Sequence, residues 1–114
     1  MAVLEPVTPA HPRPVVVTLP DEIDLANADS VGRQITAEFA RGTQVVIADM
    51  TATTFCDTLG TRALMQAHER AAVAGSELRV PLPSCDIVRV WQVLGVDAVL
   101  PIYPSLEEAI TGVR

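Results

Sequence analysis

A threonine hydroxyl at the start of a predicted helix is the group in this sequence best suited to chemistry. Thr58 follows Asp57, whose carboxylate is well suited to cap the helix, so the threonine hydroxyl is not needed for capping. A phosphate added there would place a dianion at a helix N-terminus, where backbone N–H groups stabilise anions. Gly60 removes side-chain bulk beside Thr58 and would let a partner backbone approach. The alternative is that Thr58 serves local hydrogen bonding only.

The segment before Thr58 is typical of a buried strand followed by a loop. Residues 45–50 begin with three consecutive β-branched residues, as expected of a strand that is covered on both faces. Residues 49–54 are mostly polar and predict a turn, after which Phe55 and Cys56 are expected to return to the core. The helix start would then lie at the carboxyl end of the strand, where α/β sheets place their sites.

Strand and helix patterns alternate along the rest of the chain, which predicts an α/β fold with a mostly parallel or mixed sheet. Pro81 indicates that the third strand lies toward an edge or ends early. The expected strands are residues 15–19, 45–50, 78–82 and 99–102, and the expected helices are residues 24–41, 58–74, 84–94 and 105–110.

Three of these helices have recognisable apolar faces or caps. The expected inner faces are Leu25, Ala28, Val31, Ile35 and Phe39 in the first helix, and Ile87, Val90, Trp91 and Leu94 in the third. The expected caps are Asp24 or Asn27 for the first helix, Ser84 for the third and Ser105 for the last.

The N-terminal residues 1–14 are rich in proline and form a separate segment, in which residues 2–7 could be an edge strand followed by a loop. Residues 15–114 are long enough for one domain with a single core. The acidic net charge of −6 argues against a nucleic-acid surface and against binding to anionic membranes. No membrane span and no secretory signal are recognisable, and two cysteines do not make a disulfide framework, so we expect a cytoplasmic protein.

Four motifs in order resemble those of anti-sigma factor antagonists of the STAS superfamily. Residues 19–24, LPDEID, resemble the family's Leu-x-Gly-Glu-Ile-Asp, with Asp21 in place of the glycine. Asp49 and residues 55–60, FCDTLG, resemble its phosphorylation segment. Residues 87–110, which include LGV and SLEEA, resemble its C-terminal part.

The resemblance implies a STAS fold with a four- or five-stranded mixed sheet and about four helices packed mainly on one side. It implies a non-enzymatic regulator without a cofactor, in which Thr58 occupies the position of the family's phosphorylated serine. In that family the unphosphorylated antagonist binds an anti-sigma factor that is itself a serine/threonine kinase, and thereby frees a sigma factor. Phosphorylation of the antagonist breaks this complex, and a phosphatase restores it.

The resemblance also indicates a partner-binding surface around Thr58. Its members are Glu22, Asp24, Asp49, Asp57, Leu59, Gly60 and Arg62. Leu59 replaces a small hydroxyl residue of the family, and Thr61 and Arg62 stand where it usually has Leu and Gly. These departures leave an alternative, an unphosphorylated STAS module of a transporter or stress-signalling complex. Nucleotide binding is a further alternative, although no phosphate-cradling glycine-rich loop supports it.

The remaining reactive residues support weaker hypotheses. Cys56 and Cys85 are expected to be inert buried thiols, the alternative being a redox-switched disulfide. The acidic residues at 21, 22 and 24 lack further ligands at suitable spacing, so we expect no metal. His68 falls on a helix stretch expected to be exposed, and Trp91 and Tyr103 are expected in the core and at its rim.

Overall fold

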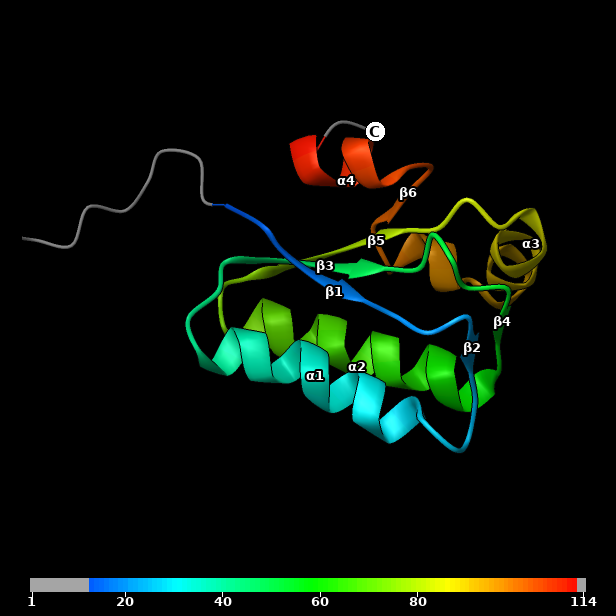
Figure 1. Cartoon of the computed structure of the whole chain (residues 1–114), viewed down its shortest axis with the longest axis horizontal. Coiled ribbons are helices and arrows are strands. Elements are labelled where there is room, and N and C mark those ends of the chain that lie inside the picture. The colour runs from blue at the N-terminus through cyan, green and yellow to red at the C-terminus, as the bar shows by residue number, and fades with distance from the viewer. Residues whose placement is uncertain (1–12, 113–114) are drawn as a thin grey trace, which may run out of the picture.

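Four parallel strands form the centre of the fold (Figure 1). The computed structural model describes residues 13–112, so the strand expected at residues 2–7 lies outside the described part of the chain. The order in the sheet is β1 (Val15–Thr18), β3 (Val45–Asp49), β5 (Glu77–Pro81) and β6 (Ile102–Tyr103). A second sheet of two short parallel strands joins β2 (Glu22–Ile23) to β4 (Phe55–Cys56). The α/β class is confirmed, and within residues 13–112 every strand pair is parallel where the sequence predicts a mixed sheet.

Helices cover both faces of the main sheet, with the two long helices together on one face. Figure 1 shows α1 (Ala28–Ala40) and α2 (Thr58–Val73) below the sheet, and the short α4 (Leu106–Thr111) above it. The third helix, α3 (Cys85–Leu94), lies at the end of the sheet near β4 and leads into a short 3-10 helix, Val96–Ala98. Thr58 thus begins a helix that follows directly after the small second sheet.

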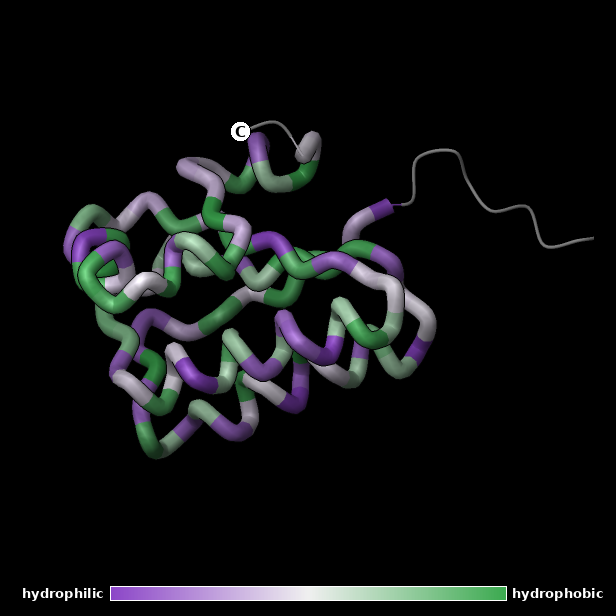
Figure 2. The backbone as a smooth tube through the Cα atoms, turned by 180° about the vertical axis from the view of Figure 1, so that it is seen from behind, coloured by the Kyte–Doolittle hydropathy of each residue, from purple (hydrophilic) through white to green (hydrophobic). Residues whose placement is uncertain are grey.

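The main core lies between the sheet and the pair α1 and α2. Alternate residues of β3 point to opposite faces, so that Val46 and Ala48 join this core. Ile47 instead packs with Tyr103 and Ala109 under α4. Both faces of β3 are therefore covered, which explains its uninterrupted apolar run. Figure 2 shows apolar and polar segments alternating along α1 and α2, as expected of amphipathic helices.

The C-terminal strand region differs from the prediction. A strand is expected at residues 99–102, but the 3-10 helix ends at Ala98 and the strand is only Ile102–Tyr103. This strand pairs with β5, so β5 is internal rather than at an edge. Pro81 is tolerated because it is the last residue of β5 and its carbonyl still accepts a bond from the Met50 N–H at 3.1 Å.

Several residues expected in the core are exposed. Leu25 is 78% exposed because α1 begins only at Ala28, which leaves Leu25 in the preceding turn. In α3, Ile87 and Trp91 are buried, whereas Val90 and Leu94 are 55% and 61% exposed. Ile87 and Trp91 are one helical turn apart and form a narrow apolar stripe. Because α3 lies at the end of the sheet, only this stripe is buried.

Candidate functional site

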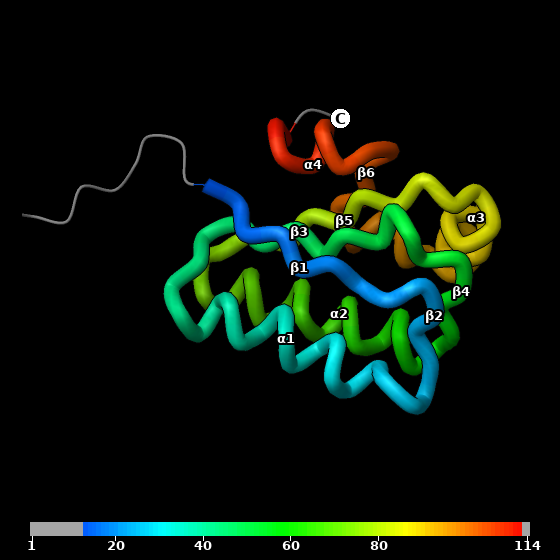
Figure 3. Tube along the Cα trace, in the orientation of Figure 1, coloured from blue at the N-terminus to red at the C-terminus, as the bar shows by residue number. Residues whose placement is uncertain are grey.

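The pairing of β2 with β4 brings two segments that are distant in sequence next to the start of α2 (Figure 3). Glu22 lies opposite Phe55 and Ile23 lies opposite Cys56. The Asp57 N–H then donates to the Ile23 carbonyl oxygen at 3.0 Å. The acidic turn after the first strand and the Thr58 segment therefore form one continuous surface at the carboxyl end of the sheet.

Side-chain hydrogen bonds fix both segments of this surface. The buried Thr53 hydroxyl donates to the Pro20 carbonyl oxygen at 2.8 Å. In the acidic turn, the Asp24 N–H donates to Asn27 Oδ1 at 2.9 Å, and Asn27 Nδ2 donates to the Glu22 carbonyl oxygen at 2.8 Å. Asn27 thus occupies the N-cap position of α1, but it ties down the preceding turn and makes no cap bond to the helix.

Asp57 caps α2 as the sequence predicts. Its Oδ1 accepts a hydrogen bond from the Gly60 N–H at 2.9 Å. Thr58 is exposed at the first helical position, and its hydroxyl makes no hydrogen bond among residues 13–112. The hydroxyl of Thr58 is therefore exposed, and local hydrogen bonding within residues 13–112 does not account for it.

Gly60 is required by packing inside the molecule. A Cβ atom at this position would lie 2.6 Å from Ile23 Cγ2 and 2.9 Å from Cys56 Sγ, both far inside contact distance. The glycine therefore lets α2 sit directly on the β2–β4 pair. We assign Gly60 to the support of the site instead of to its contact surface.

Thr61 joins α2 to α3 through a buried hydrogen-bond chain that sequence reasoning missed. Its hydroxyl donates to the Asp57 carbonyl oxygen at 2.9 Å and accepts from the Trp91 indole Nε1 at 3.1 Å. Thr61 is 8% exposed and Trp91 only 1%. A buried indole N–H needs a partner, and Thr61 supplies it.

The other expected surface residues divide into exposed and buried members. Asp49 is only 7% exposed, and its Oδ1 accepts from the Thr51 N–H at 2.9 Å, so it stabilises a turn beneath the surface. Glu22, Leu59 and Arg62 are exposed, whereas Asp24 and Asp57 are half-buried.

Phe55 joins the exposed group, contrary to its expected return to the core. It is 50% exposed, because the two residues of β4 point to opposite sides and Cys56 takes the inner one. An exposed aromatic ring close to Thr58 is the kind of residue that anchors protein–protein contacts.

The two cysteines differ in their environment, and neither forms a disulfide. Cys85 is exposed and Cys56 is half-buried, so the prediction of two buried thiols is wrong for Cys85. Burial raises the pKa of the Cys56 thiol, the Thr61 hydroxyl beside it acts in the lowering direction, and the charge of Asp57 raises it further. Cys56 thus favours the neutral thiol, which is the less reactive form.

Two features are absent from residues 13–112, a cluster of metal ligands and a membrane-spanning helix. No group of three or more His, Cys, Asp or Glu side chains is arranged there to hold a metal ion. No helix in that range has the length and apolar character needed to cross a membrane.

His68 is half-buried instead of exposed, and its Nδ1 atom is buried without a hydrogen-bond partner in the described part of the chain.

Comparison with known proteins identifies the class of protein. The chain matches the model of the STAS domain family over residues 5–109. It therefore belongs to the STAS domain family, as the motifs at residues 19–24 and 55–60 predict. A comparison with curated proteins gives no match.

Solved structures with the same fold include an antagonist, a cell fate determinant and a transporter family protein. An anti-sigma factor antagonist from Mycobacterium paratuberculosis is 27% identical, with a TM-score of 0.79 over 91% of this chain and 88% of that one. The Bacillus cell fate determinant SpoIIAA in its phosphorylated form is 23% identical, with a TM-score of 0.66 over 98% of each chain. A sulfate transporter family protein from Wolinella succinogenes is 16% identical, with a TM-score of 0.77 over 94% of this chain and 88% of that one. The predicted STAS fold is confirmed, and the last two similarities concern the fold alone.

Proposed function

We propose that this STAS domain is a bacterial anti-sigma factor antagonist whose partner binding is switched by phosphorylation of Thr58. The observation that carries the proposal is the free, exposed hydroxyl of Thr58 at the capped N-terminus of α2. The similarity to the Mycobacterium paratuberculosis antagonist supports the choice of partner class.

The unphosphorylated protein would bind an anti-sigma factor with serine/threonine kinase activity in the cytoplasm and so release a sigma factor for transcription. The contact surface would centre on Thr58, with Phe55 and Leu59 as its exposed apolar members. Glu22 and Asp24 extend this surface across the β2–β4 pair. The domain acts here as a binding module and contributes no catalytic group of its own.

A phosphate on Thr58 has opposite effects in the free and bound states. In the free protein, the N-terminal N–H groups of α2 favour the added negative charge, and Arg62 stands one turn further along the same helix. In a close interface, the dianion would lie next to Asp57 and would have to be desolvated. Phosphorylation therefore favours the free protein, and a phosphatase would reverse the switch.

Intact-mass analysis tests the proposal directly. The protein is incubated with ATP and each candidate anti-sigma kinase of the same genome, alongside Thr58→Ala and the hydroxyl-retaining control Thr58→Ser. We expect one phosphate on the parent and on Thr58→Ser but none on Thr58→Ala. A kinase that binds in a parallel pull-down and transfers no phosphate would contradict the switch. That outcome would favour the unphosphorylated module of a transporter or stress-signalling complex.

A further inference from the structure

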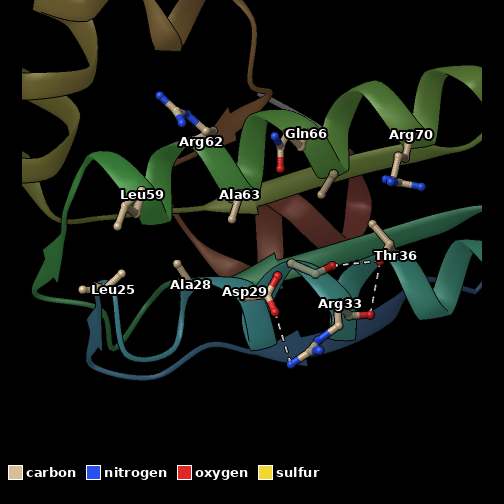
Figure 4. Close-up of a pocket in the computed structure, with 12 residues that line it drawn as sticks. Leu25, Ala28, Asp29, Arg33, Thr36, Leu59, Arg62, Ala63, Gln66 and Arg70 are labelled. Carbon is tan, nitrogen blue, oxygen red and sulfur yellow. Dashed lines mark hydrogen bonds and ion pairs between the residues drawn. The ribbon is translucent and has the colours of Figure 1, made fainter.

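A groove of about 420 Å³ runs between α1 and α2 on their outer side (Figure 4). Small residues form its floor where the two helices approach closely. A Cβ atom at Gly32 would lie 3.6 Å from the Ala63 Cβ, and Ala28 and Ala67 continue the same stripe. The groove is therefore an open depression between the two helices, with small side chains at its base.

The charge of this groove is opposite to that of the protein as a whole. The chain carries a net charge of −6, yet the groove is lined by Arg33, Arg62 and Arg70 against the single carboxylate of Asp29. Asp29 is already paired with Arg33, with 3.3 Å between Oδ2 and Nη2. Arg62 and Arg70, both on α2, have no ion-pair partner within residues 13–112. These two guanidinium groups are thus available to an acidic partner.

One end of the groove is apolar. Leu25, from the turn before α1, is 78% exposed, and Leu59, in the first turn of α2, is 38% exposed. Figure 4 shows both leucines at the same end of the groove, with Arg70 further along α2. An occupant that matches the groove therefore needs apolar side chains at one end and carboxylates along its length.

We propose that this groove is a docking site for an acidic amphipathic helix of a partner protein. Arg62 and Arg70 are eight residues apart on α2, which corresponds to about 12 Å along the helix axis. A partner helix in the groove meets the Arg70 guanidinium, Arg62 adds positive charge at the rim, and the leucines or similar residues of the partner cover Leu25 and Leu59. The docking site shares Leu59 and Arg62 with the surface around Thr58, but it does not use the Thr58 hydroxyl.

The separation of the charges favours a helix over a small anion. A phosphate or nucleotide site requires several donors that converge on one point. Arg62 and Arg70 are two turns apart, and Figure 4 shows them extending from α2 in different directions. The exposed leucines at the end of the groove also contribute nothing to an inorganic anion, but they suit the apolar face of a helix.

An NMR titration with a synthetic peptide tests the docking site. The probe is a peptide of about 16 residues, designed with leucines at one end of its apolar face and glutamates two turns apart. In the ¹⁵N-labelled full-length protein, we expect amide shifts at Gly32 and Ala63 along the groove. Shifts confined to the Thr58 surface, or none at millimolar peptide, would overturn the proposal.

Charge reversal gives the matched comparison. The double variant R62E/R70E is expected to bind the peptide at least about tenfold more weakly than the parent, because the attraction between the arginines and the peptide carboxylates becomes repulsion. The double variant R13E/R89E makes the same change in net charge at two exposed arginines outside the groove and is expected to change binding less than about twofold. If both variants lose the same affinity for the peptide, net charge alone explains the effect and the proposal is overturned. The dispersed amide spectrum of each variant reports that it is folded.

Two further samples separate this site from other interpretations. Thr58→Ala is expected to bind the peptide as the parent does, so the docking result is independent of the phosphorylation switch. ATP and inorganic phosphate are expected to leave the groove amides unshifted at concentrations that match the peptide. Groove shifts with either anion and none with the peptide would make this a small-anion site and contradict the helix.

Discussion

The two sides of the first turns of α2 are built in opposite ways. On the inner side, Gly60 packs against β2 and β4, and Thr61 joins the Asp57 carbonyl to the Trp91 indole. On the outer side, Thr58 has no hydrogen bond to its hydroxyl among the described residues, and Arg62 has no ion pair there. One short stretch of sequence thus combines a fixed support with an exposed surface. Substitutions on the inner side should change stability, whereas those on the outer side should change binding.

The largest effect is expected when a methyl group is added to the inner side. Gly60→Ala places a Cβ 2.6 Å from Ile23 Cγ2 and should lower the free energy of unfolding by about 3 kcal/mol. Gly32→Ala is the matched control, because its Cβ meets only the Ala63 Cβ at 3.6 Å. There the higher helix propensity of alanine should stabilise the protein by roughly 0.5–1 kcal/mol. Urea unfolding of both variants gives the comparison, and equal effects would contradict the internal packing of Gly60.

The same substitution on the two sides should give different results. Thr61→Val leaves the buried Trp91 N–H without its acceptor and should cost about 2 kcal/mol. Thr58→Val, three residues earlier on the exposed side, should change stability by less than about 0.5 kcal/mol. Thermal unfolding and the fluorescence of the single tryptophan report both effects. A loss of the same size in Thr58→Val would mean that the exposed hydroxyl has a structural role after all.

A smaller effect is expected at the cap that separates the two sides. Asp57→Ala removes the acceptor of the Gly60 N–H and should lower stability by about 1 kcal/mol. Asp57→Asn keeps a side-chain oxygen at the same place and should restore most of this loss, because asparagine caps helices as well as aspartate does. Chemical unfolding of the two variants measures the cap. If both lose the same amount, the charge of Asp57 and not its cap bond stabilises the helix start.

The smallest effect concerns the ionisation of Cys56 behind the same turn. Burial raises its pKa, so the folded protein holds the thiol proton more tightly than the unfolded chain does. The stability that the neutral thiol contributes is present below the unfolded-chain pKa of about 8.5 and is lost as the pH rises through the folded-state pKa. The parent should therefore lose stability relative to Cys56→Ser in alkaline buffer. A constant difference between the two proteins from pH 7 to alkaline pH would contradict the raised pKa.

The sequence predicts the architecture well because its signals are local. The β-branched run of β3 and the caps Asp57, Ser84 and Ser105 all appear in the structure as predicted. The predictions fail where tertiary contacts determine which residues are buried. Leu25 has the helical spacing of a core residue, yet it precedes the helix and is exposed. The spacing of apolar residues begins at Leu25, but it does not reveal that the helix itself begins only at Ala28.

The candidate site is predictable in its residue types but not in the direction of each side chain. The hydroxyl at 58 and the aspartate before it are recognisable as an N-terminal pair. Phe55 is exposed where the sequence predicts a core residue, and Gly60 is buried where it predicts a surface residue. Both differences arise from the parallel pairing of β2 with β4, which the sequence does not specify. The one tryptophan offers a missed signal, since a buried indole N–H requires an acceptor.

The central claim is that a phosphate on the free side of α2 prevents partner binding while the supporting side stays unchanged. Calorimetry with a purified anti-sigma kinase measures its affinity for the unphosphorylated and for the Thr58-phosphorylated protein. We predict that phosphorylation weakens binding by about a hundredfold, as expected when like charges meet in a desolvated interface. Equal affinities for the two forms, with both proteins folded, would contradict the account.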